Sequence, residues 1–452
     1  MGQNTLSRHF IIQYSSMMYE RRTAMKICTI GAGYVGLTTS AVLADLGHNV
    51  ICIDNNQKKI DHLREGKSPI YEPGLIELMK KNSKQLSFST NIRDAIHQSS
   101  VIFIAVGTPS SSNGATDLSH IYSVIREISL SIDSYKTIVI KSTVPPGTSQ
   151  NIIDILSKNV EATLFNVVMN PEFLREGSAI WDMLHPNKTV LGIAVHDNYS
   201  EKIMKEIYKG LDAPFIVTSL AGAEMIKYAS NSFLAMKISF INEIARICES
   251  FQIDVTDVAN GIGKDPRIGN LFLKAGLGYG GSCFPKDVRS LTYTAKTKNI
   301  DTPLLDAIQK INHTQVLFYL SKLKTILPTL SSKKVAVLGL SFKPHTDDTR
   351  DSQSIRIVDE LLSHNCLINV YDPKAKVHID GHKNLTQSED IESTLLDSDC
   401  VILATEWDEF IKFDWKKGKE LMRGNIVVDG RNCLDKEALQ TLGFQYVGIG
   451  RG

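Results

Sequence analysis

The sequence predicts an α/β protein in which two doubly wound, mostly parallel sheets are joined by a long central helix. Three observations support this fold class. A strand, a glycine-rich turn, a helix and a second strand follow one another within residues 26–54. A similar strand-to-glycine opening recurs at 334–340. Between them, Ala221 to Phe251 keeps helical spacing without proline, which is long for a globular helix and indicates a connector or a dimer core.

The first half carries the pattern of a dinucleotide site. Gly31 allows a tight turn, Gly33 lets a pyrophosphate approach the backbone, and Gly36 lets the helix pack on the strand. The helix N-terminus then faces the phosphates. Asp54 ends the second strand and would accept hydrogen bonds from the adenosine ribose, which favours NAD over NADP. In this context a chance glycine turn is the weaker interpretation.

Further strands are predicted where short, continuous apolar runs occur, at 101–106 and 137–140. Ligands of open α/β sheets bind beyond the carboxyl ends of the strands. Thr108 and the Ser142-Thr143 pair follow two of these ends and are candidate contacts, although ordinary turn chemistry explains Ser142 equally well.

The stretch 165–177 is predicted to be a strand that runs into a loop, with Glu172 and Glu176 four positions apart. Solvated surface glutamates are the common case. A loop at a strand end beside a cofactor is, however, where an acid or a base would be placed. The loop is therefore a candidate part of the site.

The central helix carries Lys227 and Asn231 one turn apart on one face. A lysine among apolar residues usually reaches out to solvent. A buried one would have a lowered pKa or would hold an oxyanion. Its apolar neighbours are expected in the core: Ile226, Phe233, Met236 and Ile238.

The stretch 278–287 combines three glycines with Cys283, Lys286 and Asp287. The glycines let the backbone pass close to a ligand. Cys283 is the candidate nucleophile, Lys286 could hold its thiolate, and Asp287 could handle a proton. The alternative is a flexible loop with an inert, buried cysteine.

The second half repeats the doubly wound pattern, so both halves are expected to be Rossmann-like domains. Strands are predicted at 334–340, 367–371, 400–404 and 426–429, with a helix at about 352–363. This half lacks the full glycine pattern, so we expect it to bind the nucleotide part of a substrate. Lys343 and Arg431 follow strand ends and could meet its phosphates.

Composition excludes several function classes. A net charge of +1 gives no support for binding nucleic acid or membrane surfaces. The seven scattered cysteines, without a CxxC pair or a metal-spaced cluster, indicate a reducing, cytoplasmic compartment and no metal site. We expect an N-terminal extension at 1–24, a cofactor domain at 25–215, a central helical domain at 216–325 and a C-terminal domain at 326–452.

From Lys26 to Arg431 the chain resembles the UDP-glucose/GDP-mannose dehydrogenase family. The motifs that carry the resemblance are GAGYVG, KSTVP, NPEFLREG, the Lys227/Asn231 helix, GGSCFPKD and Phe342-Lys343. The continuation at 175–179 and the glycine-rich Cys283 loop look like the UDP-glucose branch. The resemblance implies a four-electron oxidation of UDP-glucose to UDP-glucuronate with two NAD reduced.

The resemblance also implies roles for individual residues. Cys283 would form a thiohemiacetal and then a thioester, and Lys227 and Asn231 would stabilise the oxyanion. Asp287 and Thr143 would hold a water that takes a proton, and Glu172 or Asp287 would act as the base in hydrolysis.

The remaining implied contacts concern ligands. Those to NAD are Gly31, Gly33, Tyr34, Val35, Gly36, Asp54, Lys59, Thr108, Thr143, Glu176, Lys286 and Arg350. Those to the UDP-sugar are Glu172, Phe173, Leu174, Arg175, Lys227, Asn231, Arg267, Lys274, Tyr279, Gly280, Phe342, Lys343 and Arg431. Arg267 would reach the neighbouring subunit's site in a homodimer built on the central helix. The alternatives are a sister enzyme for GDP-mannose or a UDP-N-acetylhexosamine, and a non-catalytic NAD-binding scaffold.

Overall fold

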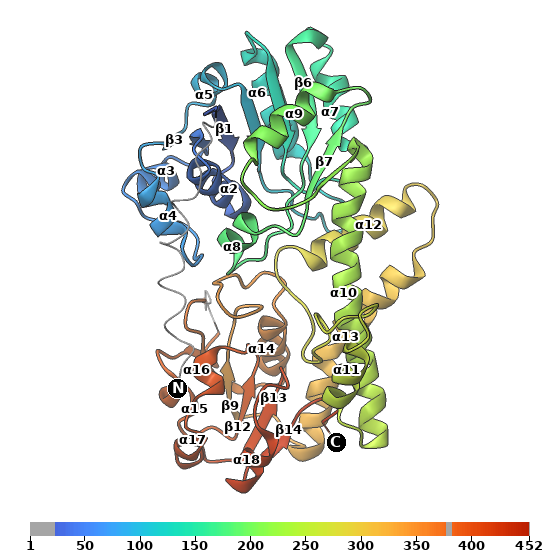
Figure 1. The fold of residues 1–452 in the computed structure, drawn as a ribbon. Coiled ribbons are helices and arrows are strands. Elements are labelled where there is room, and N and C mark those ends of the chain that lie inside the picture. Colours follow the sequence, from blue (N-terminus) through green and yellow to red (C-terminus); the bar gives the residue numbers. More distant parts are fainter. Residues whose placement is uncertain (1–22, 377–381, 452) are drawn as a thin grey trace.

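The computed structural model describes residues 23–376 and 382–451, so the predicted extension at 1–24 lies almost entirely outside the described residues. Two α/β lobes are stacked end to end, and one long helix, α10 (Leu220–Phe251), runs along both (Figure 1). This confirms the predicted fold class of two Rossmann-like doubly wound units joined by a central helix.

The first lobe is an eight-stranded sheet. Its strands are β1 (Lys26–Ile30), β2 (Asn49–Ile53), β3 (Leu86–Ser89), β4 (Val101–Ile104), β5 (Lys136–Ile140), β6 (Phe165–Met169), β7 (Thr189–Ile193) and β8 (Phe215–Ser219). They are ordered β3-β2-β1-β4-β5-β6-β7-β8, and all neighbours are parallel except β6 and β7. The order reverses between β1 and β4, which is where ligands of such sheets bind.

Helices cover both faces of this sheet (Figure 1). They are α2 (Tyr34–Asp45), α3 (Gln57–Arg64), α4 (Leu75–Lys81), α5 (Ile92–Gln98), α6 (Ser119–Ser131), α7 (Thr148–Leu156), α8 (Ala179–Leu184) and α9 (Asn198–Ile207), with a 3-10 turn at Ala162–Leu164. Strands β4 and β5 are buried along their whole length, as their continuous apolar runs predict.

Helix α10 begins where Ser219 accepts a hydrogen bond from the Gly222 N–H, and it ends at Gln252 in the left-handed conformation. Its buried face packs against α12 (Phe284–Lys296) and α13 (Pro303–Ile326), and α11 (Val255–Gly263) follows it. The core prediction for Phe233 is wrong, because its side chain is 58% exposed on the opposite face.

The second lobe is a six-stranded, all-parallel sheet. Its elements are β9 (Lys334–Leu338), α14 (Gln353–Ser363), β10 (Leu367–Tyr371), β11 (Leu385–Gln387), α15 (Ile391–Leu395), β12 (Cys400–Leu403), α16 (Asp408–Ile411), α17 (Trp415–Leu421), β13 (Ile426–Asp429), α18 (Lys436–Thr441) and β14 (Gln445–Val447). The strand order is β11-β10-β9-β12-β13-β14, so the reversal lies between β9 and β12. The carboxyl ends of both sheets and the start of α12 meet between the lobes (Figure 1).

Candidate active site

The glycine turn after β1 has the geometry that a dinucleotide needs. Gly31 has a φ of +103°, and a Cβ there would lie 2.7 Å from the Ala105 carbonyl oxygen. A Cβ on Gly36 would lie 1.7 Å from the Gly31 carbonyl oxygen, so only glycine at this position lets the first turn of α2 pack against the turn after β1. A Cβ on Gly33 would meet nothing within 4 Å, which leaves the space over the N-terminus of α2 open to a phosphate.

Asp54 is oriented at the end of β2 by its neighbours. Its carboxylate accepts hydrogen bonds from the Ala32 N–H at 2.9 Å, the Asn56 N–H at 3.0 Å and the Lys59 Nζ at 2.8 Å. Burial works the other way, but these donors hold the pKa of Asp54 below its usual value. The carboxylate is therefore ionised and can accept further hydrogen bonds from a ribose.

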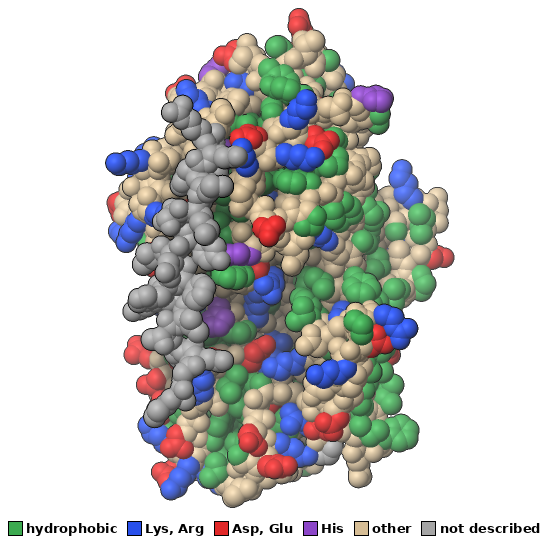
Figure 2. Space-filling view, viewed as in Figure 1, with side chains coloured by type: hydrophobic (Ala, Val, Ile, Leu, Met, Phe, Trp, Pro, Cys, Tyr) green, Lys and Arg blue, Asp and Glu red, His purple; other side chains and the backbone are tan. Residues whose placement is uncertain are grey.

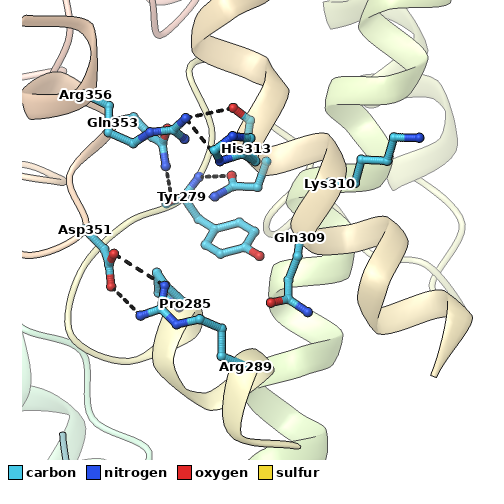
Figure 3. Close-up of a pocket in the computed structure, with 10 residues that line it drawn as sticks. Tyr279, Pro285, Arg289, Gln309, Lys310, His313, Asp351, Gln353 and Arg356 are labelled. Carbon is cyan, nitrogen blue, oxygen red and sulfur yellow. Dashed lines mark hydrogen bonds and ion pairs between the residues drawn. The ribbon is translucent and has the colours of Figure 1, made fainter. Parts of the chain in front are cut away.

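Cys283 lies at the N-terminus of α12. The backbone of the loop before it is held by hydrogen bonds with neighbouring side chains. Asn312 clamps Tyr279, accepting from its N–H at 2.8 Å and donating to its carbonyl at 3.0 Å. Gln353 donates to the same carbonyl at 2.9 Å. Figure 3 shows this part of the loop, where these residues line a pocket of about 420 Å³ and Arg289 pairs with Asp351. The loop is thus fixed rather than flexible.

The site around Cys283 contains a buried lysine–glutamate pair. Lys227 Nζ donates to Glu172 Oε1 at 2.9 Å, and only 3% and 6% of the two side chains are exposed. Lys227 is therefore buried and does not reach solvent, unlike most lysines among apolar residues. Burial alone would lower its pKa, but Glu172, Cys283 and Asp287 raise the pKa of Lys227 above its ordinary value. The lowered pKa allowed by the sequence is wrong, and the ammonium is a permanent cation beside the thiol.

A second polar group lies on the other side of the thiol. Asn231 Nδ2 donates to Asp287 Oδ2 at 2.6 Å, and Lys286 Nζ donates to Asp287 Oδ1. Lys286, suggested as the partner of a Cys283 thiolate, is thus paired with a carboxylate instead. Burial and Glu172 raise the pKa of Cys283 to about 11, although Lys227 opposes them. The thiol is protonated before reaction.

Glu176 forms the third group. Ser282 Oγ donates to Glu176 Oε1 at 2.7 Å, and the Arg350 guanidinium lies 3.6 Å from the same oxygen. Arg350 also pairs with Asp348 at 2.7 Å. Burial and the Asp348 charge raise the pKa of Glu176 to about 7. This carboxyl therefore changes its protonation near neutral pH.

The loop after β6 is also organised by its own backbone. The Leu174 N–H donates to Glu172 Oε2 at 2.8 Å, and the Phe173 ring lies 5.3 Å from Lys227 Nζ. Arg175 turns away and pairs with Asp182 at 2.6 Å. Thr108 Oγ1 donates to the Thr143 carbonyl at 2.9 Å, so the turns after β4 and β5 lie together.

The second lobe contributes a basic edge. Arg431 donates to the carbonyls of Ala404, Gly278 and Phe342, which ties the second sheet to the Cys283 loop. Burial lowers the pKa of Lys343, and the negative charge of Glu176 acts in the opposite direction. Figure 2 shows Lys and Arg side chains gathered in the hollow between the lobes. Such a cluster suits an anionic ligand.

Two predicted ligand residues lie apart from this cluster. The Arg267 side chain is 86% exposed and pairs with Asp265 at 2.5 Å, and Lys274 is exposed. A Cβ on Gly280 would lie 2.5 Å from the Asp351 carbonyl oxygen, so this residue serves the close approach of the loop to the second lobe.

Sequence reasoning missed Glu72, a buried carboxylate that supports the glutamate loop. It accepts from the N–H groups of Gly177 at 2.6 Å and Ala179 at 2.7 Å, and Tyr34 Oη accepts from the Gly177 N–H at 2.7 Å. This links the start of α2 to the loop that carries Glu176. Residues 71–74, Tyr-Glu-Pro-Gly before a helix, gave only a turn signal. Ser282 and Asp348 were missed as well.

Three sequence profiles of one family match the chain in succession. They are the NAD binding domain of the UDP-glucose/GDP-mannose dehydrogenase family at residues 25–212, its central domain at 221–314 and its UDP binding domain at 336–436. The chain belongs to the UDP-glucose/GDP-mannose dehydrogenase family. It is thus related to NAD-dependent oxidoreductases, and NAD is the cofactor of its first domain.

Individual members of this dehydrogenase family are similar to this protein along nearly the whole chain. YtcA of Bacillus subtilis is 52% identical over 428 residues, which are 94% of this chain and 100% of YtcA. The UDP-glucose 6-dehydrogenase YwqF of the same organism is 42% identical over 94% of this chain and 98% of YwqF. A solved UDP-glucose dehydrogenase from Pyrobaculum islandicum superposes with a TM-score of 0.90 at 34% identity, covering 96% of this chain and 100% of that chain.

The described part of this dehydrogenase chain has neither a helix suited to cross a membrane nor a cluster of side chains suited to hold a metal. In residues 23–376 and 382–451, no helix is both long and apolar enough to cross a bilayer. Over the same residues, no group of three or more His, Cys, Asp or Glu side chains is arranged to hold a metal ion.

The Asp54→Asn variant is expected to bind NADH about tenfold to a hundredfold more weakly, because it loses a charged acceptor worth about 1.5–3 kcal/mol. Affinity for UDP-glucose should stay within about twofold of the parent, since Asp54 belongs to the NAD binding domain and the UDP binding domain is a separate part of the chain. Separate calorimetric titrations of the two ligands measure this. Asp61→Asn, an exposed aspartate on α3 paired with Arg64 at 3.5 Å, is the control. Equal losses for both ligands would contradict the assignment.

Proposed function

We propose that this protein oxidises the C6 primary alcohol of UDP-glucose to the carboxylate of UDP-glucuronate, with NAD as the oxidant. The observations that carry the proposal are the Cys283 thiol, whose pKa is raised by burial and lowered by the buried ammonium of Lys227, and a cofactor turn open at Gly33. An enzyme that stops at the aldehyde needs no thiol. One that continues to the acid gains from an acyl intermediate on sulfur.

Two NAD molecules, bound one after the other, would each accept one of the two hydrides that leave C6. Each would be held by the glycine turn, by Asp54 with Lys59 at the ribose, and by the turns at Thr108 and Thr143. The chain itself handles protons and the covalent steps. Asp287, held by Asn231 at 2.6 Å and by Lys286, is a fixed carboxylate that takes up the alcohol proton through a water near Thr143.

The thiol then adds to the aldehyde carbon, forming an S–C bond and an oxyanion. Lys227 and Asn231 donate to this oxyanion from their positions one turn apart on α10. Loss of the second hydride leaves a thioester. Water hydrolyses it with Glu172 as the base, because Glu172 Oε1 lies 2.9 Å from Lys227 Nζ, the donor assigned to the oxyanion.

We also propose a division of labour among three domains, at 25–215, 216–325 and 326–452. The family profiles, which begin at 25, 221 and 336, support it. The first domain binds NAD, the central one supplies Lys227, Asn231 and Cys283, and the last one binds the UDP moiety through Phe342, Lys343 and Arg431. The last strand of the first sheet, β8, extends beyond residue 215 to Ser219.

The test is the NADH yield per UDP-glucose consumed, followed by absorbance with each nucleotide sugar supplied in turn. Two NADH per UDP-glucose are expected, with UDP-glucuronate as the product. A clear preference for GDP-mannose or a UDP-N-acetylhexosamine would overturn the substrate in favour of a sister enzyme. NAD binding without turnover of any nucleotide sugar would indicate a scaffold.

A homodimer is part of the proposal. Apolar side chains on one face of α10 are exposed, and they repeat at helical spacing: Met225, Phe233, Phe240, Ile247 and Phe251. A second copy of α10 would cover this stripe. Arg267, whose side chain is 86% exposed, would then extend into the partner's UDP-sugar site.

Phe240→Asp is expected to give a monomer in sedimentation experiments, because a carboxylate in the centre of an apolar interface costs several kcal/mol. UDP-glucose affinity should fall with it, while NADH affinity is kept. The control is Leu130→Asp, which replaces an exposed leucine on α6 that is 67% exposed and outside the stripe. A Phe240→Asp protein that sediments like the parent would rule out this interface.

A further inference from the structure

The Cys283 thiol must lose a proton when it adds to an aldehyde. The two carboxylates nearest Lys227 serve other steps of the proposed function, because Asp287 takes the alcohol proton and Glu172 a proton of the hydrolytic water. Glu172 accepts from Lys227 and from the Leu174 N–H. Asp287 accepts from Asn231 and Lys286. Lys286, in turn, carries a raised pKa because Asp287 outweighs its burial, so it is a cation and cannot accept.

The Cys283 loop itself contains a third group that can take the thiol proton. Ser282 Oγ lies 3.5 Å from Cys283 Sγ and donates to Glu176 Oε1 at 2.7 Å. A hydroxyl has one proton to donate and lone pairs to accept with. Because the Ser282 proton is directed at the carboxylate, its oxygen is free to accept from the S–H group. The thiol, hydroxyl and carboxylate thus form a hydrogen-bonded chain in which each donor points toward Glu176.

We propose that the Ser282 hydroxyl passes the Cys283 proton to the Glu176 carboxylate as the sulfur adds to the aldehyde. The S–H bond breaks and an O–H bond forms on Ser282, while the original Ser282 proton moves to Glu176 Oε1. The sulfur electron pair forms the S–C bond. The C=O π electrons move to the aldehyde oxygen, so the negative charge of Glu176 is transferred to the oxyanion that Lys227 and Asn231 stabilise, and no co-reactant is needed. This inference rests on the proposed function for its substrate.

The charged groups around Glu176 suit this role. Asp348, itself paired with Arg350, faces it from the second lobe, and burial together with that charge raises the pKa of Glu176 to about 7. Arg350 and Lys343 supply opposing positive charge, and Thr346 Oγ1 donates to Oε2 at 3.4 Å. The carboxyl is thus ionised above neutral pH yet basic enough to accept a proton.

The charged groups around the thiol determine how readily Cys283 releases its proton. Burial, Glu172 and Asp287 disfavour a free thiolate, whereas Lys227 favours it. With the pKa of Cys283 near 11 and that of Glu176 near 7, a preformed thiolate would be scarce. A proton transfer that accompanies bond formation avoids it.

The first test uses neither cofactor nor substrate. Iodoacetamide alkylation of Cys283 is followed by mass spectrometry of its peptide, so the other six cysteines do not interfere. The parental rate should rise with pH around the Glu176 midpoint near 7, because only the ionised carboxylate accepts the proton. Ser282→Ala and Glu176→Gln should lower the rate at pH 7.5 about tenfold or more and remove that inflection. Ser282→Thr, which keeps the hydroxyl, should restore both.

The second test uses the complete enzyme. Oxidation of the C6 aldehyde of UDP-glucose should slow in Ser282→Ala by the same factor as alkylation, with the KM for the aldehyde unchanged. Equal alkylation rates in parent and Ser282→Ala would overturn the relay, and so would equal losses in Ser282→Ala and Ser282→Thr, which would indicate packing. If the chain oxidised no nucleotide sugar, the alkylation result would still decide the relay separately from the proposed function.

Discussion

The Cys283→Ser variant is expected to form no UDP-glucuronate above roughly a thousandth of the parental rate, since a lost nucleophile typically costs this much or more. Serine keeps the size and a hydrogen-bonding group, but its hydroxyl is a far weaker nucleophile than sulfur. The first oxidation does not use the thiol. The variant should therefore accumulate an aldehyde-level or covalently bound species.

Product analysis by mass spectrometry together with the NADH yield measures this outcome. One NADH or less per UDP-glucose is expected, against two for the parent. Cys248→Ser, a buried cysteine on the same central helix, is the matched control and should keep full turnover. Complete oxidation by Cys283→Ser would remove the sulfur from the mechanism while leaving the first oxidation intact.

Local patterns predicted the fold well because they act at short range. The turn at Gly31 needs a positive φ, which it has, and the apolar strands lie within a residue or two of their predicted bounds. Helix α10 begins one residue before its predicted start. Phe233 was misplaced because helical periodicity shows that one face is apolar, yet it does not show whether a neighbour or a second chain covers it.

The site residue types could be read from motifs, but their charges could not. Lys227 was expected to have a lowered pKa if buried, since burial alone acts that way. Its raised pKa depends on Glu172, which is 55 positions away in the chain. The Ser282–Glu176 contact spans 106 positions and the Glu72–Ala179 contact 107. Such pairings form only when segments far apart in the chain are brought together by the fold, and no spacing rule encodes them.

The Lys227→Met variant is the second change with a large expected effect. Methionine fills a similar volume but removes the cation that faces both the thiol and the developing oxyanion. Loss of one oxyanion donor lowers kcat by about 10²–10³-fold. Removing one partner of a buried ion pair also destabilises a fold by about 3–5 kcal/mol, because the Glu172 carboxylate is left without its cation.

A double-mutant design separates these two effects. Adding Glu172→Gln to Lys227→Met removes the unpaired charge, so most of the lost stability should return, as judged by denaturant unfolding. Turnover should stay low, because the oxyanion still lacks its ammonium donor. Lys227→Arg, which keeps the charge in a larger group, should retain more activity than Lys227→Met. If stability and turnover recovered together in the double variant, Lys227 would be a structural cation only, and the oxyanion charge would have to be balanced by Asn231 and the start of α12 instead.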